Sequence, residues 1–342
     1  MQFDLIRNLP DMSALALEWN ELLANSASHV PFLRNEYLST WWQTLGGGEW
    51  SQGELSVITA RQDGRLTGIA PLFFTTNREG DPALMLLGCI EISDYLDLIA
   101  PAHTLQPFVD GLFDYLSGMQ TPAWRVLDWW NFLGTSPSLP ALEAAAKRKG
   151  WSYRPELLQH CPYIPLPGDW EKYLAEQVDK KQRHEIRRKM RRIEEFGLPV
   201  RWYIVEDEKN LDAEIEDFLQ MMAQDPEKAH FLTDAMRQQM HLALQAAFHC
   251  GWLQLAFVEI GGEKAASYIN FDFGNQIWVY NSGLDFKFRE YSPGWVLLGY
   301  LLQWANQHQR ACFDFMRGNE EYKYRFGAID RRIVRIKINR KR

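Results

Sequence analysis

The sequence contains few cysteines and none of the common catalytic or metal-binding signatures. Its four cysteines, at positions 89, 161, 250 and 312, fit neither a CxxC pair nor a Cys/His metal site. Its eight histidines form no HxxxH or HEXXH pattern, and GxSxG, Walker and GxGxxG motifs are missing. We therefore expect reduced, mostly buried thiols and no metal, and we set aside hydrolase, phosphotransferase and dinucleotide-binding functions.

Long apolar runs and low-complexity tracts are also missing. No 18 consecutive residues are apolar, and Asp4 and Arg7 interrupt the start of the chain, unlike a signal peptide. We therefore expect a cytoplasmic protein without a transmembrane segment. The chain has 342 residues, 46% of them hydrophobic and 14 of them tryptophan. This length exceeds the usual limit of about 250 to 300 residues for one core, so we expect two packed domains.

Positive charge is scarce overall but concentrated in two segments. The formal net charge is -7, yet Lys180–Arg192 carries eight Lys or Arg and one Glu, and Arg331–Arg342 carries seven and no acid. We expect these segments to meet anions, while the acidic remainder of the surface repels nucleic acid and acidic membranes. No DNA partner is therefore expected.

The order of predicted elements repeats along the chain. Each half begins with a strand and helices, continues into strands joined by turn signals at Asp63-Gly64, Gly261-Gly262 and Gly274-Asn275, and ends with a helix and a strand. This repetition predicts an α/β (α+β) protein of two similar domains, residues 1–160 and 161–342, with a proline-rich linker in 150–169. The last basic segment alternates apolar and charged residues, which predicts an edge strand or, less favoured, a membrane-surface contact.

The segment YSPG opens a predicted helix over Pro293–His308. Ser292 suits the N-cap, Pro293 suits the first turn, and Gly294 permits a close approach to the helix N-terminus, where an anion is stabilised. A phosphate site is one interpretation, and a plain helix start is the other.

A dense group of polar residues follows the predicted strand Ala311–Met316. Asp314 alternates with apolar residues and is a candidate general base or an acid that orients Lys323 or the nucleophile. A buried aspartate bonded to backbone donors is the alternative. Lys323 is a candidate for neutralising a phosphate or carboxylate, against ordinary charge pairing on a short surface helix.

The predicted helix Asp179–Phe196 has one apolar stripe and a cationic remainder. Its cations exceed its acids, so a solvated face competes with an anion-binding or substrate-binding role, with donor phosphates, a nucleotide-linked sugar or RNA as the partner. The candidates for this role are Lys180, Arg183, Arg187 and Arg188.

Together these motifs carry a family resemblance. The basic helix KKxRxxIRRxxRRxEExG, the glycine-turn meander, YSPG and DFxxGNExYKxxFG resemble the GNAT-type acyltransferase domain of CelD/BcsL-type proteins. They are similar, more distantly, to the FemABX aminoacyltransferases. The likeness covers about the last 170 residues by motif. It covers the first half by element order.

The resemblance implies tandem GNAT-like domains, each a mixed, mostly antiparallel sheet flanked by helices, with the acceptor on the N-terminal side. It implies that Trp278–Gly283 lines the arm of the donor acyl-CoA, that the amides of Tyr291–Trp295 hold its pyrophosphate, and that Tyr322, or else Tyr324, protonates the departing thiolate. YSPGW stands where such proteins have RxxGxG/A. The donor-binding candidates are Tyr280, Asn281, Ser282, Tyr291, Ser292, Gly294 and Trp295.

Three functions follow. The first is an acetyltransferase-like N- or O-acyltransferase that moves an acyl group from acyl-CoA to a polar amine or hydroxyl, such as a lipid- or nucleotide-linked envelope or polysaccharide precursor. The second is a FemABX-like transferase that uses aminoacyl-tRNA, and the third is a non-catalytic ligand-binding module. The acceptor, the acyl chain and the oligomeric state stay open.

Overall fold

The computed structural model describes residues 1–119, 122–195 and 197–340. Phe196, the predicted end of the basic helix, and the last two residues of the predicted final strand lie outside these ranges. The chain divides into two compact units, Met1–Gln159 with Arg332–Arg342 and His160–Arg331. Each unit combines sheets with flanking helices, which confirms the predicted α/β class.

The first unit contains a three-stranded sheet, ordered β1-β3-β4, and a six-stranded sheet, ordered β2-β5-β6-β7-β15-β8. Its strands are β1 (Gln2–Ile6), β2 (Glu54–Leu55), β3 (Val57–Gln62), β4 (Arg65–Ala70), β5 (Leu72–Thr76), β6 (Pro82–Leu86), β7 (Val126–Leu133), β8 (Ser152–His160) and β15 (Arg332–Asn339). Its helices are α1 (Leu9–Ala14), α2 (Ala16–Ala24), η1 (Pro31–Leu33), α3 (Asn35–Gly48), α4 (Leu105–Gly118) and α5 (Ser138–Lys149).

The apolar stretch Ala83–Ala100, whose composition favours one or two strands, forms only β6. Residues 92–100 are buried without being a regular strand. The Asn131 side chain donates hydrogen bonds of 2.7 Å to the carbonyls of Ile90 and Ser93. Side-chain donors thus replace a strand neighbour for this apolar segment.

The predicted domain 161–342 requires a correction at its end. β15 pairs antiparallel with β7 and lies between β7 and β8, so it is an inner strand of the first unit and not an edge strand. The register shifts at Arg335, whose guanidinium makes two hydrogen bonds of 2.7 Å to the buried Asp128 carboxylate. The chain passes from the first unit to the second between Gln159 and His160, inside the predicted linker over 150–169, but this segment forms β8 and β9 (Tyr163–Pro165).

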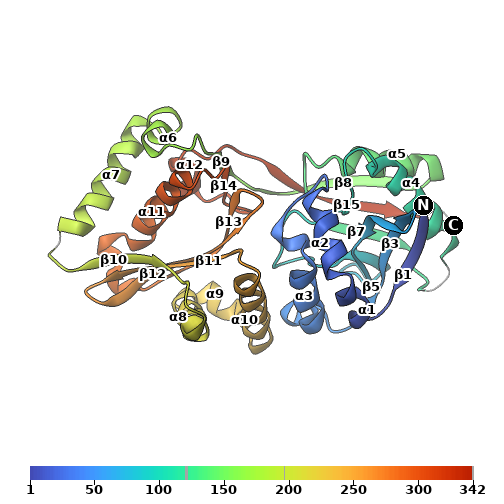
Figure 1. Cartoon of the computed structure of the whole chain (residues 1–342), viewed down its shortest axis with the longest axis horizontal. Coiled ribbons are helices and arrows are strands. Elements are labelled where there is room, and N and C mark those ends of the chain that lie inside the picture. Colours follow the sequence, from blue (N-terminus) through green and yellow to red (C-terminus); the bar gives the residue numbers. More distant parts are fainter. Residues whose placement is uncertain (120–121, 196, 341–342) are drawn as a thin grey trace. The chain divides into compact units, whose positions relative to one another are not determined.

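The second unit has a six-stranded sheet, ordered β10-β11-β12-β13-β14-β9. Its other strands are β10 (Val200–Ile204), β11 (Leu253–Ile260), β12 (Glu263–Phe273), β13 (Gln276–Leu284) and β14 (Cys312–Asp314). Its helices are α6 (Trp170–Glu176), α7 (Lys180–Glu195), η2 (Glu208–Asn210), α8 (Leu211–Met222), α9 (Pro226–Phe231), α10 (Asp234–His249), η3 (Phe286–Tyr291), α11 (Pro293–Gln307) and α12 (Glu321–Arg325). Figure 1 shows α7 and α11 on one face of this sheet and α8 and α10 on the other.

The three predicted hairpin turns are confirmed. Both residues of each turn have positive φ, for example 63° and 84° at Gly261 and Gly262, as a two-residue hairpin requires. Each unit also contains one parallel strand pair connected through a helix, β6 and β7 through α4, and β13 and β14 through α11. An antiparallel strand then follows, β15 in the first unit and β9 in the second.

The parallel pair of the second unit separates after a short contact. β14 pairs with β13 only from Gln276 to Trp278, although β13 continues to Leu284. A bulge also shifts the pairing of β12 with β13, so that Tyr280 is the extra residue and Tyr268 lies opposite Ser282. From Val279 onward the edge of β13 that faces β14 is therefore free of strand pairing among the described residues.

We predict that Arg335→Leu strongly destabilises the first unit. The substitution leaves Asp128, which is fully buried, without its cation, and an uncompensated buried charge costs about 3 to 5 kcal/mol. Urea unfolding of the full chain measures the change. Arg125→Leu is the control, since its pair with Asp81 is exposed and should contribute less than about 1 kcal/mol. Equal losses for the two variants would contradict the prediction.

Candidate functional site

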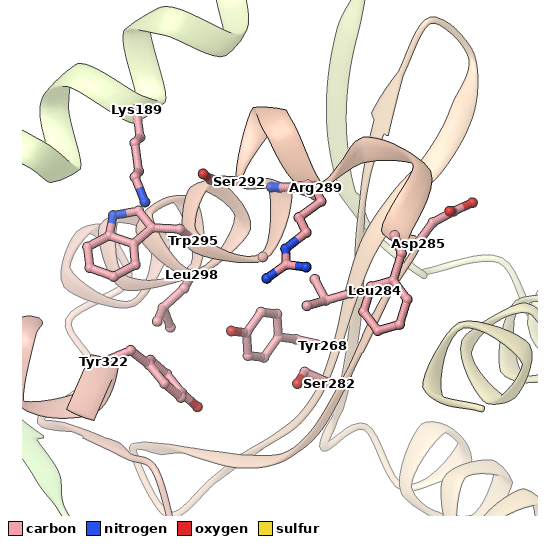
Figure 2. Close-up of a pocket in the computed structure, with 13 residues that line it drawn as sticks. Lys189, Tyr268, Ser282, Leu284, Asp285, Arg289, Ser292, Trp295, Leu298 and Tyr322 are labelled. Carbon is pink, nitrogen blue, oxygen red and sulfur yellow. The ribbon is translucent and has the colours of Figure 1, made fainter. Parts of the chain in front are cut away.

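A cavity of about 590 Å³ opens in the second unit between the end of β13 and the start of α11. Figure 2 shows that its side chains come from α7, β12, β13, η3, α11 and α12. The lining residues are Lys189, Tyr268, Ser282, Leu284, Asp285, Phe286, Arg289, Ser292, Pro293, Gly294, Trp295, Leu298 and Tyr322. This volume suits a small-molecule ligand.

The start of α11 forms one wall. Pro293 occupies the first turn as predicted, but the Ser292 side chain does not cap the helix, because Ser292 is left-handed (φ 54°, ψ 48°). A Cβ at position 294 would lie 2.7 Å from Cδ2 of Leu284, so glycine permits the close approach of α11 to β13.

Two cations border the cavity near this helix start (Figure 2). Lys189 Nζ lies 4.3 Å from the centroid of the Trp295 ring, and burial lowers the pKa of Lys189. Arg289 is exposed, and its guanidinium has no hydrogen bond or ion pair within the described ranges. Asp285 adds a carboxylate, which accepts a hydrogen bond from the Lys287 backbone. The helix dipole and the two cations favour an anion here.

Three hydroxyl groups border the cavity away from the helix start (Figure 2). Tyr268 is 5% exposed and lies opposite Ser282 in the β12–β13 ladder. Tyr322 comes from α12. Burial raises the pKa of both tyrosines, and for Tyr322 the nearby Tyr268 contributes to the rise. None of the three hydroxyls has a hydrogen-bond partner in the part of the chain that the structure describes.

Asp314 is surrounded by protein groups that bond to its carboxylate. Asp314 is fully buried, accepts a 2.8 Å hydrogen bond from the Met316 backbone and forms an ion pair with Arg331. It does not border the cavity. The alternative of a bonded, buried aspartate therefore describes it better than the general-base hypothesis.

Lys323 is also held inside the protein. It is 3% exposed, and its ammonium donates to the carbonyls of Phe315, Arg317 and Gly318 at 3.3, 2.9 and 3.2 Å. Glu320 lies 2.8 Å away. Through these hydrogen bonds Lys323 holds the loop before α12 in place. Its ammonium is not placed to neutralise a ligand in the cavity.

The remaining predicted residues separate into two groups. Ser282, Ser292, Gly294, Trp295 and Tyr322 border the cavity. Tyr280, Asn281 and Tyr291 do not border it, although they are sequence neighbours of residues that do. The Tyr280 ring contacts Phe271, and the Tyr291 ring contacts Phe288. The Asn281 side chain accepts a 3.0 Å hydrogen bond from Lys228.

The four cations predicted on α7 lie outside the cavity. Arg187 pairs with Glu171, and Arg188 pairs with Glu185 at 2.8 Å. Lys180 is exposed and Arg183 is partly buried. Their role in binding an anion stays a prediction.

Sequence reasoning missed several residues that shape the site. Lys189 belongs to the basic run but was not distinguished from its neighbours, although it follows the buried Ile186 by three positions and shares its helix face. Arg289 stands three residues before Ser292, which was a usable signal. Tyr268 had none, because its place depends on the bulge at Tyr280.

Comparison with known proteins identifies the class of the second unit. Residues 180–324 match a family described as acetyltransferase (GNAT) domain. A search of curated proteins gives no match for the chain. The matched range contains all the residues that line the cavity.

Solved structures extend the comparison to the whole chain. One described as FemX has a TM-score of 0.66 at 10% identity and covers 98% of this chain and 97% of its own. The C-terminal domain of a putative lysylphosphatidylglycerol synthetase from Agrobacterium fabrum has a TM-score of 0.57 at 10% identity, covering 98% and 93%. L-PGS from Bacillus licheniformis has a TM-score of 0.57 at 11% identity, with the same coverage.

At such low identity these structures share the fold alone. With the repeated strand order they show a tandem GNAT-like fold, and residues 180–324 match the GNAT acetyltransferase domain within it. The CelD/BcsL-type likeness stays a prediction.

None of the four cysteines forms a disulfide within the described ranges, and Cys89, Cys161 and Cys312 are buried while Cys250 is exposed, which confirms the predicted thiols. Across the described ranges, no cluster of three His, Cys, Asp or Glu side chains is arranged to hold a metal ion. Helices in the same ranges are too short or too polar to cross a bilayer.

We predict that Lys323→Met lowers the free energy of unfolding by about 1.5 to 3 kcal/mol, because buried carbonyls lose a charged donor. Arg325→Met on the same short helix should cost less than about 0.5 kcal/mol, since its i,i+4 pair with Glu321 is exposed. Denaturant titration of both variants measures the difference. A Lys323 variant as stable as the Arg325 variant would argue against the fastening role.

Proposed function

We propose that the second unit is an acyltransferase that binds an acyl-CoA in the cavity and transfers its acyl group to an amine or hydroxyl acceptor. The observation that carries this proposal is the combination of side chains around the cavity. Lys189 and Arg289 bring positive charge from α7 and η3, Tyr268, Ser282 and Tyr322 bring hydroxyls from the sheet and α12, and apolar side chains such as Leu298 complete the lining (Figure 2).

The residues present fit the parts of such a donor. Lys189, Arg289 and the N-terminus of α11 would hold phosphates. The β13 edge after Trp278 has no strand neighbour among the described residues, so an extended, amide-containing arm could lie beside it. Trp295 and Leu298 offer apolar contact, and the buried indole N–H of Trp295 has no acceptor within the described residues. A thioester donor, when bound, supplies the activated acyl carbon.

Tyr322 is the proposed general acid. Burial keeps its hydroxyl protonated at neutral pH, because the charged phenolate is disfavoured in an apolar site. It would protonate the thiolate that leaves when the acceptor nitrogen or oxygen attacks the acyl carbon. The proton lost by the acceptor then restores Tyr322, so the reaction needs no further reactant.

The first unit is proposed to serve the acceptor side. Residues 92–100 follow β6 in the first unit, just as the residues that line the cavity follow β13 in the second unit. Residues 92–100 are buried, which supports placing the donor in the second unit. We further propose a cytoplasmic enzyme whose acceptor is a polar envelope or polysaccharide precursor. The sequence motifs shared with CelD/BcsL-type proteins support this acceptor class.

A transferase that uses aminoacyl-tRNA is the second candidate. The observation that favours it is the exposed cationic surface of α7, which lies outside the cavity and includes Lys180, Lys181 and Arg188. Such a surface suits a polyanion larger than the cavity can accept.

We predict that Lys189→Ala/Arg289→Ala weakens acetyl-CoA binding roughly 10- to 100-fold, because two contacts to phosphates are lost. Calorimetric titration of the full chain measures the dissociation constant. Lys181→Ala/Arg188→Ala removes the same charge from α7 outside the cavity and should leave the constant within about threefold. No binding of acetyl-CoA or longer acyl-CoAs by the wild-type chain would overturn the proposed function and favour a ligand-binding module of another kind.

Charge reversal separates the two donors. We predict that Lys180→Glu/Arg188→Glu leaves transfer from acyl-CoA within about threefold, since both residues lie away from the cavity. Transfer from aminoacyl-tRNA, if that is the donor, should fall by a factor of roughly 100. Assays with both donors, at one fixed salt concentration, decide between the candidates.

We predict that Tyr322→Phe lowers the rate of CoA release roughly 100-fold while acetyl-CoA affinity stays within about threefold. Because the pKa of Tyr322 is raised, the wild-type rate should not decline from tyrosine ionisation below about pH 10. Chromatographic measurement of free CoA across pH gives the rate. A wild-type rate that falls near neutral pH with this tyrosine as the titrating group would contradict its role.

A further inference from the structure

Tyr268 and Ser282 form a pair of hydroxyls that the proton transfer above does not use. The two residues lie directly opposite each other on β12 and β13, so their side chains are on the same face of the sheet. Both border the cavity. Figure 2 shows the Tyr268, Ser282 and Tyr322 hydroxyls gathered at the same side of the cavity.

These hydroxyls open into the cavity without a partner inside the protein. Tyr268 as a whole residue is 5% exposed, and tyrosine hydroxyls in such surroundings usually make a hydrogen bond. In the described residues, however, no donor or acceptor contacts the Tyr268 hydroxyl or Ser282 Oγ. The backbone of Ser282 is nevertheless held firmly, since its carbonyl accepts a 2.6 Å hydrogen bond from Lys228 Nζ. The pair is thus fixed in place with its hydrogen bonds left for a ligand.

The chemistry of the pair fits an oxygen that accepts hydrogen bonds. Burial raises the pKa of Tyr268, so its hydroxyl remains a donor at neutral pH. Arg289 and Lys189 already account for the anionic end of a donor, at the start of α11. The group that reaches the hydroxyls is therefore the opposite end of that donor, which is its acyl carbonyl.

We propose that Tyr268 and Ser282 donate hydrogen bonds to the oxygen of the reacting acyl carbonyl, an assignment that rests on the proposed acyl-CoA reaction. When the acceptor attacks the acyl carbon, a carbon–nitrogen or carbon–oxygen bond forms and the carbonyl π electrons move to oxygen. Tyr268 and Ser282 stabilise this oxyanion. When the carbonyl reforms, the carbon–sulfur bond breaks and the thiolate takes its proton from Tyr322.

The experiment compares wild-type chain with Tyr268→Phe, Ser282→Ala and the double variant. Free CoA is measured chromatographically with acetyl-CoA and either water or a mixture of small amines as acceptor, which does not require the natural acceptor. The double variant should lose roughly 100-fold in kcat, with KM for acetyl-CoA within about threefold. Tyr203→Phe is the matched control: it removes a tyrosine hydroxyl from β10 that bonds Glu214, away from the cavity, and should leave kcat unchanged.

Calorimetry supplies a readout independent of turnover. If the wild-type chain binds acetyl-CoA without detectable turnover, the double variant should lose the preference for acetyl-CoA over CoA, by roughly three- to tenfold, because CoA lacks the carbonyl. Unchanged kcat, unchanged preference, or an equal loss of affinity for both ligands would overturn the inference and leave the proposed function standing. A wild-type chain that binds neither ligand would overturn both.

Discussion

The separation of β14 from β13 after Trp278 is the constraint on which the site depends. Parallel strands that stayed paired would close the edge of β13 and fill the space beside α11. β14 departs because Asp314 is tied to the Met316 backbone and to Arg331, with Met316 in a left-handed conformation. The Lys323 ammonium then donates hydrogen bonds to the carbonyls of the following loop. These charged groups therefore hold the backbone beside the cavity and do not line it.

This arrangement explains a division of labour among the polar residues of the second unit. Groups with protein partners, such as Asp314 and Lys323, hold the backbone in place. Groups without partners in the described residues, such as Tyr268 and the Arg289 guanidinium, border the cavity. A polar group that faces the cavity without a partner keeps its hydrogen-bonding capacity for water or a ligand. Lys189 belongs to neither group alone, because it borders the cavity and also lies 3.7 Å from Glu185.

Much of the fold follows from local signals. The three turns were predictable because residues such as Gly261 and Gly262 readily adopt the positive φ that a two-residue hairpin needs. Counting back from the turn at Gly274-Asn275 would place Tyr268 opposite Asn281. The bulge at Tyr280 moves the pairing by one residue, to Ser282. Since one step exchanges the faces of a strand, no local pattern could assign Tyr268 to the cavity.

The surroundings of Asp314 and Lys323 could not be predicted for a related reason. Their partners are fixed by tertiary structure, as with Arg335, which pairs with Asp128 across 207 positions of sequence. Motif spacing identifies a dense group of titratable residues but not which of them pair with one another. The helix start at Pro293 was predictable, whereas the left-handed Ser292 that replaces a side-chain cap was not.

The position of β15 has a consequence for how the chain is made. Residues 160–331 are continuous in sequence and contain every described strand of their sheet, so this unit has all these parts before β15 is synthesised. The first unit lacks an inner strand until Arg332–Asn339 is synthesised. Until the same point the Asp128 carboxylate lacks Arg335, its partner in the ion pair. The usual order in which N-terminal domains fold first on the ribosome is thereby reversed for the completed structures. Until β15 is synthesised, the edge of β7 that it covers has no strand neighbour.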